Sequence, residues 1–98
     1  MLVKIHKSYR NVVAVCDSDL LGKKFEEDKF QLDLKESFYN GDEMSDEDAA
    51  NIMRRMLRED ATFNIVGKKS INAALKAEII SEGEIGEIKN IPFALVLG

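Results

Sequence analysis

The feature that most constrains the fold is an uninterrupted apolar run from Val12 to Cys16. Three of its five residues are valines, and β-branched side chains favour strands. A strand without polar alternation is typical of the centre of a sheet. The preceding segment, Leu2 to Lys7, alternates apolar with polar or charged side chains, which is the pattern of a half-buried strand. Residues 8–11 contain Ser and Asn, which favour turns, so we expect the two strands to form a hairpin.

Two segments have the spacing of amphipathic helices. The first begins at Ser45, which lies three residues before Asp48 as in a capping box. Its apolar stripe comprises Ala49, Ile52, Met53, Met56 and Leu57, and arginines follow in its last turns. The second is expected to be capped by Ser70 and to bury Ile71, Ala74 and Leu75, with Ile79 one turn further on.

Three further segments are expected to be strands: Phe30 to Leu34, Phe63 to Val66 and Phe93 to Leu97. The intervening segments are interpreted as a helical turn through Leu20 and Leu21, a surface acidic run at residues 26–28 and a turn at Asn40-Gly41. The sequence therefore predicts a fold of the α/β (or α+β) class. We expect one small domain over residues 1–98, with about four to five strands and two main helices.

Composition narrows the functional classes. With Cys16 as the only cysteine, the chain has no intramolecular disulfide and no cysteine-based zinc site. No apolar run approaches the roughly 20 residues that cross a bilayer, and the first residues lack the apolar region of a signal peptide. We therefore expect a cytoplasmic protein without a membrane partner. The net charge of −4 argues against DNA binding, although residues 1–24 carry five Lys or Arg against two Asp.

The segment Gly67-Lys68-Lys69-Ser70 is a candidate anion or RNA-phosphate site. It connects a predicted strand to a predicted helix, so free backbone N–H groups and two lysines would converge there. A phosphate-binding P-loop would need a glycine five positions before the Gly-Lys pair, where Thr62 stands, so nucleotide hydrolysis is rejected. The alternative interpretation is an ordinary turn and helix cap.

A second candidate set surrounds the first hairpin. Tyr9 at the expected tip could stack on a base, and Arg10 lies beside it. The other exposed cations of this set are Lys4, His6 and Lys7 near the hairpin, and Arg54, Arg55 and Arg58 on the first predicted helix. The alternative is a solvated surface on which the arginines pair with Glu59, Asp60 and their neighbours.

Two other patterns are weaker candidates for a catalytic or metal site. Cys16 and His6 would share a face if His6 paired with Ala14, but would point to opposite faces if Lys7 paired with Val12. A buried cysteine is the commoner outcome. The acidic run over residues 42–48 lacks the spacing of a calcium loop, and helix-dipole matching explains three of its five carboxylates. We therefore assign no catalytic residues, metal site or cofactor, and favour a protein that is not an enzyme.

Several segments in order resemble an archaeal family known as domain of unknown function four-two-four. They are Lys4 to Lys7, Val13 to Asp17, Leu20 to Glu27, Leu32 to Tyr39 and Asn64 to Ser70, and the similarity continues to residues 91–94. The resemblance implies an archaeal, cytoplasmic protein of small α/β type that associates with the translation machinery. It implies no activity, because the family offers no catalytic residues to carry over.

Two functional hypotheses follow. The favoured one is a non-catalytic interaction or adaptor protein that contacts RNA or a ribonucleoprotein through Tyr9, Arg10 and the segment Gly67, Lys68, Lys69 and Ser70. The alternative is a small-molecule binding protein or enzyme that holds an anionic ligand at the Gly67 to Ser70 helix N-terminus. A homo-oligomer formed through the last strand, if that strand lies at a sheet edge, is a third option.

Overall fold

The computed structural model describes residues 1–97 and contains a six-stranded mixed sheet in the order β5-β1-β2-β6-β8-β7. Its strands are β1 (Leu2–His6), β2 (Val12–Cys16), β5 (Asp42–Glu43), β6 (Thr62–Val66), β7 (Gly86–Ile88) and β8 (Ile91–Val96). A separate antiparallel hairpin consists of β3 (Lys24–Glu27) and β4 (Phe30–Asp33). The helices are α1 (Glu36–Tyr39), α2 (Asp46–Arg58) and α3 (Lys68–Lys76), with 3-10 turns η1 (Ser18–Leu20) and η2 (Glu82–Glu84). The predicted α/β class is confirmed.

The apolar run of β2 lies at the centre of the sheet, as predicted. It pairs antiparallel with β1 and parallel with β6. Val13 and Val15 face a core formed with α2 and α3, whereas Ala14 and Cys16 face a second core. Because both faces of β2 are covered, none of its side chains needs to be polar.

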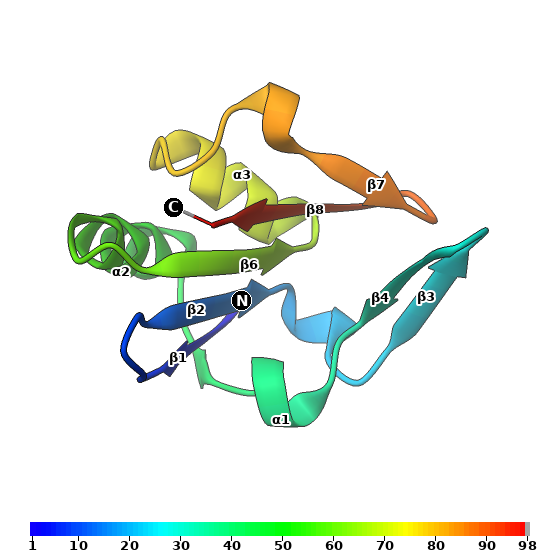
Figure 1. The fold of residues 1–98 in the computed structure, drawn as a ribbon, viewed down its shortest axis with the longest axis horizontal. Coiled ribbons are helices and arrows are strands. Elements are labelled where there is room, and N and C mark those ends of the chain that lie inside the picture. The colour runs from blue at the N-terminus through cyan, green and yellow to red at the C-terminus, as the bar shows by residue number, and fades with distance from the viewer. Residues whose placement is uncertain (98) are drawn as a thin grey trace.

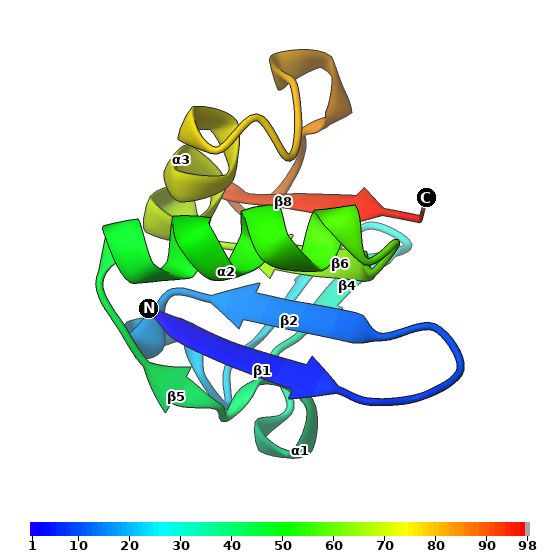
Figure 2. The same cartoon turned by 90° about the vertical axis from the view of Figure 1, so that its left-hand side faces the viewer.

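Helices α2 and α3 cover one face of the sheet, and the β3–β4 hairpin lies across the other (Figures 1 and 2). The α2 prediction is confirmed, since Ala49, Met53 and Met56 are buried and the Ser45 side chain accepts a hydrogen bond from the Asp48 amide. Leu57, assigned to the buried stripe, is instead 40% exposed. It lies in the last turn of α2.

The second core packs under η1, the β3–β4 hairpin and α1. It contains Leu20, Leu34 and Tyr39 against the sheet residues Cys16 and Val66. Strand β3 includes Glu26 and Glu27, which were interpreted as part of a surface acidic run at residues 26–28. Only Phe25 of β3 is even half-buried, which explains why apolar periodicity did not reveal the strand.

Residues 1–97 contain eight strands, more than the four to five expected, and α3 differs from its prediction at both ends. The helix begins at Lys68, so Ser70 lies within its first turn and is not its cap. It ends before Glu78, whose φ of 60° is incompatible with a right-handed helix, yet Ile79 beyond it is still buried.

Strand β8 lies inside the sheet, between β6 and β7, and not at an edge. Only Ile91, Pro92 and Phe93 pair with the short strand β7, so Ala94 to Val96 have β6 on one side alone. Among residues 1–97, no helix is long and apolar enough to cross a membrane.

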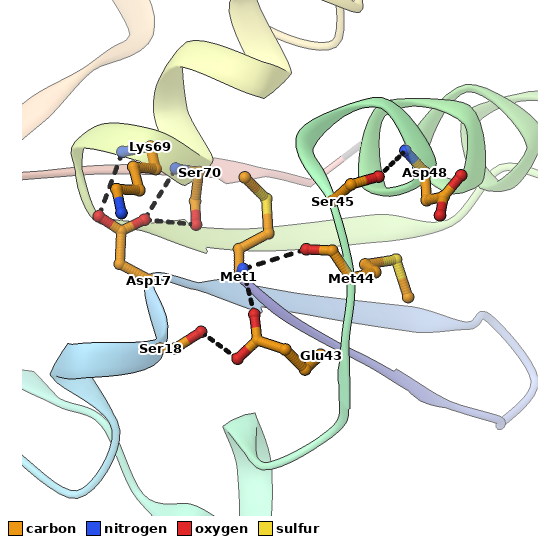
Figure 3. Close-up of polar contacts among 9 residues, drawn as sticks. All are labelled: Met1, Asp17, Ser18, Glu43, Met44, Ser45, Asp48, Lys69 and Ser70. Atoms are coloured by element: carbon orange, nitrogen blue, oxygen red, sulfur yellow. Dashed lines mark hydrogen bonds and ion pairs between the residues drawn. The ribbon is translucent and has the colours of Figure 1, made fainter.

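Glu43 connects the edge strand β5 to two other elements (Figure 3). Its carboxylate lies 2.5 Å from the Met1 ammonium nitrogen and accepts a 2.5 Å hydrogen bond from the Ser18 hydroxyl. These hydrogen bonds stabilise the charged form and lower the pKa of Glu43. The contacts attach β5 to β1 and η1.

Candidate functional site

The N-terminus of α3, which the sequence presented as an anion site, is occupied by the chain's own Asp17 (Figure 3). One carboxylate oxygen accepts hydrogen bonds from the Ser70 amide and hydroxyl, both at 2.8 Å. The other accepts one from the Lys69 amide at 3.1 Å. Asp17 and Ser70 are both buried. The backbone donors predicted to hold an external anion therefore already hold an internal carboxylate.

Gly67 leaves room for the Asp17 carboxylate because it has no side chain. Its φ is +109°, and a Cβ built there would lie 2.3 Å from the Asp17 Cγ, far inside van der Waals contact. Its amide is also engaged, because it donates to the Pro92 carbonyl at 2.8 Å. Gly67 therefore belongs to the closed contact between β2 and α3.

The side chains of Lys68 and Lys69 remain exposed outside this contact. They border a shallow, mainly apolar depression on α3 together with Ile71, Leu75 and Pro92. The two lysines thus offer exposed surface charges, while the amides of Lys69 and Ser70 already bond Asp17. Asp17 is the residue that sequence reasoning missed, because it was interpreted only as the end of a strand and the start of a turn.

Tyr9 and Arg10 lie at the opposite end of the sheet. Figure 1 shows the β1–β2 turn on the left and the β6–α3 connection on the right. Strands β2 and β6 run parallel between these ends for five paired residues, a rise of roughly 16 Å. The structure therefore does not bring Tyr9 and Arg10 together with the Gly67 to Ser70 segment.

The Tyr9 side chain is fully exposed to solvent. Arg10 is fixed beside it, because its Nε donates to the Asp60 carbonyl at 2.7 Å. The Asn11 carbonyl accepts from the Thr62 amide at 2.9 Å, which holds the same turn against the start of β6. The tip is therefore a positioned turn that presents one aromatic ring to solvent.

The last turn of α2 lies at this same end of the molecule (Figures 1 and 2). We call this surface the basic end, and define it by the exposed residues Lys7, Tyr9, Arg10, Arg55 and Arg58. Glu59 and Asp60 line a hollow together with Tyr9 and Arg10, and Arg55 Nε is 4.0 Å from the Glu59 carboxylate. Four cations against two carboxylates give this surface a positive balance on a chain of net charge −4.

His6 and Cys16 do not form a catalytic pair. They share a face of the sheet, but His6 pairs with Val12 while Cys16 pairs with Leu2, so neither of the two registers considered above occurs. Four residues of strand separate them, roughly 13 Å. His6 stacks on Phe38 at a centroid distance of 4.6 Å.

Cys16 is inaccessible to solvent, and burial raises the pKa of its thiol to about 11. A nucleophilic thiolate is therefore disfavoured at neutral pH. The acidic run of residues 42–48 is divided between β5 and the first turn of α2. Among residues 1–97, no group of three or more His, Cys, Asp or Glu side chains has the geometry to hold a metal ion.

Comparison with known protein families shows to which family the chain belongs. The family model for a protein of unknown function, DUF424, matches residues 6–98. The chain belongs to the DUF424 family. A solved structure superposes on this DUF424 chain with a TM-score of 0.87 and 30% sequence identity, covering 97% of this chain and 88% of the other. That structure is described as an uncharacterized conserved protein from Methanopyrus kandleri, an archaeon. No match was found among curated proteins.

Proposed function

We propose that this DUF424 chain is a non-catalytic interaction protein that contacts RNA, free or within a ribonucleoprotein of the translation machinery, through its basic end. The observation that carries the proposal is the fully exposed ring of Tyr9, held on a fixed turn among cations. An exposed tyrosine ring makes little apolar contact with its own protein, and it gains such contact when a base stacks on it.

The charge distribution supports the same surface. Lys7, Arg10, Arg55 and Arg58 are exposed on the basic end, where Glu59 and Asp60 line the same hollow as Tyr9 and Arg10. The four cations can neutralise phosphates of a strand whose base stacks on Tyr9. The acidic segment at residues 42–48 lies elsewhere, in β5 and at the start of α2. A phosphate backbone would thus be attracted to the basic end and repelled from the acidic segment.

The alternative of an anionic small molecule at the α3 N-terminus loses its physical basis. Asp17 uses the amides of Lys69 and Ser70, and a second anion there would be repelled by its carboxylate. The RNA contact is therefore assigned to Tyr9 and Arg10 and not to Gly67, Lys68, Lys69 or Ser70.

The test is fluorescence anisotropy with a single-stranded RNA oligonucleotide of mixed sequence at low and at moderate salt. Tyr9→Ala is expected to weaken binding about tenfold, the lower part of the range for loss of one base–aromatic stack. The double variant Lys7→Glu/Arg58→Glu is expected to weaken binding and to flatten its dependence on salt. Both substituted side chains are exposed, so folding should be unaffected.

The matched control is Lys68→Glu/Lys69→Glu, which changes charge equally at the opposite end. It is expected to leave the Tyr9-dependent component intact. No RNA binding by the unmodified protein, or equal losses from both double variants, would refute the assignment. Affinity capture from lysate with and without RNase then tests the cellular setting, where RNase-sensitive recovery of ribosomal proteins is expected.

A further inference from the structure

A cavity of about 220 Å³ separates strand β4 from the face of the sheet opposite α2 and α3. Residues that line it include Leu32, Asp33, Tyr39, Asn64, Phe93 and Leu95. They come from the hairpin, from α1 and from the central strands β6 and β8. The cavity is thus built from segments far apart in the sequence, and it lies apart from the basic end and from the α3 N-terminus.

Asn64 is a polar residue in the middle of the central strand β6. It pairs with Ala14 on one side and Leu95 on the other, while its neighbours Phe63 and Ile65 point into the core under the helices. The half-buried Asn64 side chain therefore faces the hairpin side, where it lines the cavity. Within residues 1–97 this carboxamide forms no hydrogen bond with the protein, although it offers both donors and an acceptor.

Tyr39 brings a second polar group to the same cavity. Its side chain is 8% exposed, and within the described part of the chain its hydroxyl has no hydrogen-bond partner. Every fully buried side-chain N or O atom of residues 1–97 does have a partner, so the hydroxyl must reach solvent. Tyr39 is among the residues that line the cavity. Burial raises the pKa of Tyr39 to about 12, so the hydroxyl remains a donor at neutral pH.

Apolar walls face these groups. The Phe93 ring is held against Gly86, where an added Cβ would lie 2.7 Å from its Cζ. Leu32 and the 52% exposed Leu95 complete the apolar surface. A cavity lined by an aromatic ring, leucine side chains and hydrogen-bonding groups suits a planar heterocycle.

Charge and size restrict the ligand further. No Lys, Arg or His is among the residues that line the cavity in the part of the chain described, and Asp33 is its one charged group. A phosphate or carboxylate would therefore be repelled. The volume equals that of roughly seven waters and lies below the range of about 300–1,000 Å³ for drug-sized ligands, so it accommodates a single ring system.

We propose that this cavity binds an uncharged nucleobase, free or as the base of a nucleoside, with Asn64 and Tyr39 hydrogen-bonding its edge and Phe93 and Leu95 contacting its faces. This inference is independent of RNA binding at the basic end. It requires no phosphate contact and therefore predicts binding that hardly depends on salt.

The test is a titration of isotope-labelled protein with adenosine, guanosine, cytidine and uridine at millimolar concentrations, followed by amide NMR. At least one nucleoside is expected to shift the Asn64 side-chain amide and the backbone amides of β4, and to bind more tightly than its 5′-monophosphate. Tyr39→Phe, which removes one hydroxyl and keeps the ring, should weaken binding about tenfold. Asn64→Leu should abolish it.

Asn72→Leu, on the surface of α3, is the control and should bind as the unmodified protein does. The proposal is overturned if no nucleoside shifts these amides, if the monophosphates bind as tightly, or if a folded Tyr39→Phe protein binds normally. An intact amide spectrum establishes folding of each variant.

Discussion

The α-carbon of Gly67 packs directly against the carboxylate of Asp17, 50 residues earlier in the chain. This contact lets Asp17 reach the first turn of α3 and bond Lys69 and Ser70. It joins the end of the central strand β2 to the start of α3, and it closes the helix N-terminus to external anions. Its consequences for stability can be measured directly.

Gly67→Ala is expected to destabilise the protein by about 2–4 kcal/mol. The added methyl would overlap the Asp17 carboxylate, and alanine rarely adopts a φ of +109°. Urea unfolding followed by circular dichroism measures the change. Gly83→Ala is the control, since nothing lies within 4 Å of a Cβ there, and it should stay within about 0.5 kcal/mol of the unmodified protein.

Asp17→Asn should lower the free energy of unfolding by about 1–3 kcal/mol. The amide keeps one acceptor oxygen but places an NH₂ group against a backbone N–H of α3, and it removes the charge that complements the helix dipole. Asp19→Asn, a neighbouring exposed carboxylate, should have little effect. Equal stability of the two variants would show that the Asp17 contact contributes nothing.

Asp17→Ala should convert the α3 N-terminus into an anion site. Without the carboxylate, the amides of Lys69 and Ser70 lose their partner and Lys69 lies nearby. Sulfate is therefore expected to raise the melting temperature of this variant more than that of the unmodified protein. Sodium chloride at matched ionic strength is the control, and an identical response to both salts would contradict the prediction.

Stability should fall at alkaline pH because of Cys16 and Tyr39. Burial raises the pKa of the Cys16 thiol from 9.0 to about 11 and that of the Tyr39 hydroxyl from 10.0 to about 12. The unfolded chain therefore loses these protons first as pH rises, which favours unfolding. This stabilisation is complete below about pH 9, the unfolded thiol pKa, and is lost as pH rises to the folded values of about 11 and 12.

Urea unfolding at several pH values from 7 to 11 measures that loss. Cys16→Ala and Tyr39→Phe should each make the decline with pH shallower, whatever their effect on absolute stability. In the same pH range, iodoacetamide should modify Cys16 far more slowly in the native protein than in the unfolded protein. A decline of the same slope in both variants would assign the alkaline loss to other groups.

Ser45→Ala should lower the free energy of unfolding by about 1 kcal/mol. The Ser45 hydroxyl oxygen accepts a hydrogen bond from the Asp48 amide at the start of α2, and alanine cannot. The matched control is Ser37→Ala in the short helix α1, where the hydroxyl makes no hydrogen bond within residues 1–97. Thermal unfolding compares the two variants. If both behave like the unmodified protein, the Ser45 cap is not stabilising.

Locally encoded features were predictable. The β1–β2 hairpin and helix α2 follow from short-range periodicity and capping, since each pattern is complete within about a dozen residues. The start of α3 was predicted less well, because its capping carboxylate comes from Asp17 and not from its own sequence. Strand β3 was missed because Phe25 alone carries its packing.

The candidate sites divide in the same way. By itself the sequence established the α/β class, the central apolar strand, the cationic and aromatic turn at Tyr9 and Arg10, and the resemblance to the family. The tertiary structure alone decided that Asp17 fills the α3 N-terminus, that the basic end lies at the opposite end of the sheet, and that Asn64 and Tyr39 line the same cavity. Hydrogen bonding and side-chain periodicity act within a few residues, whereas contacts between distant segments depend on the order and direction of strands in the sheet.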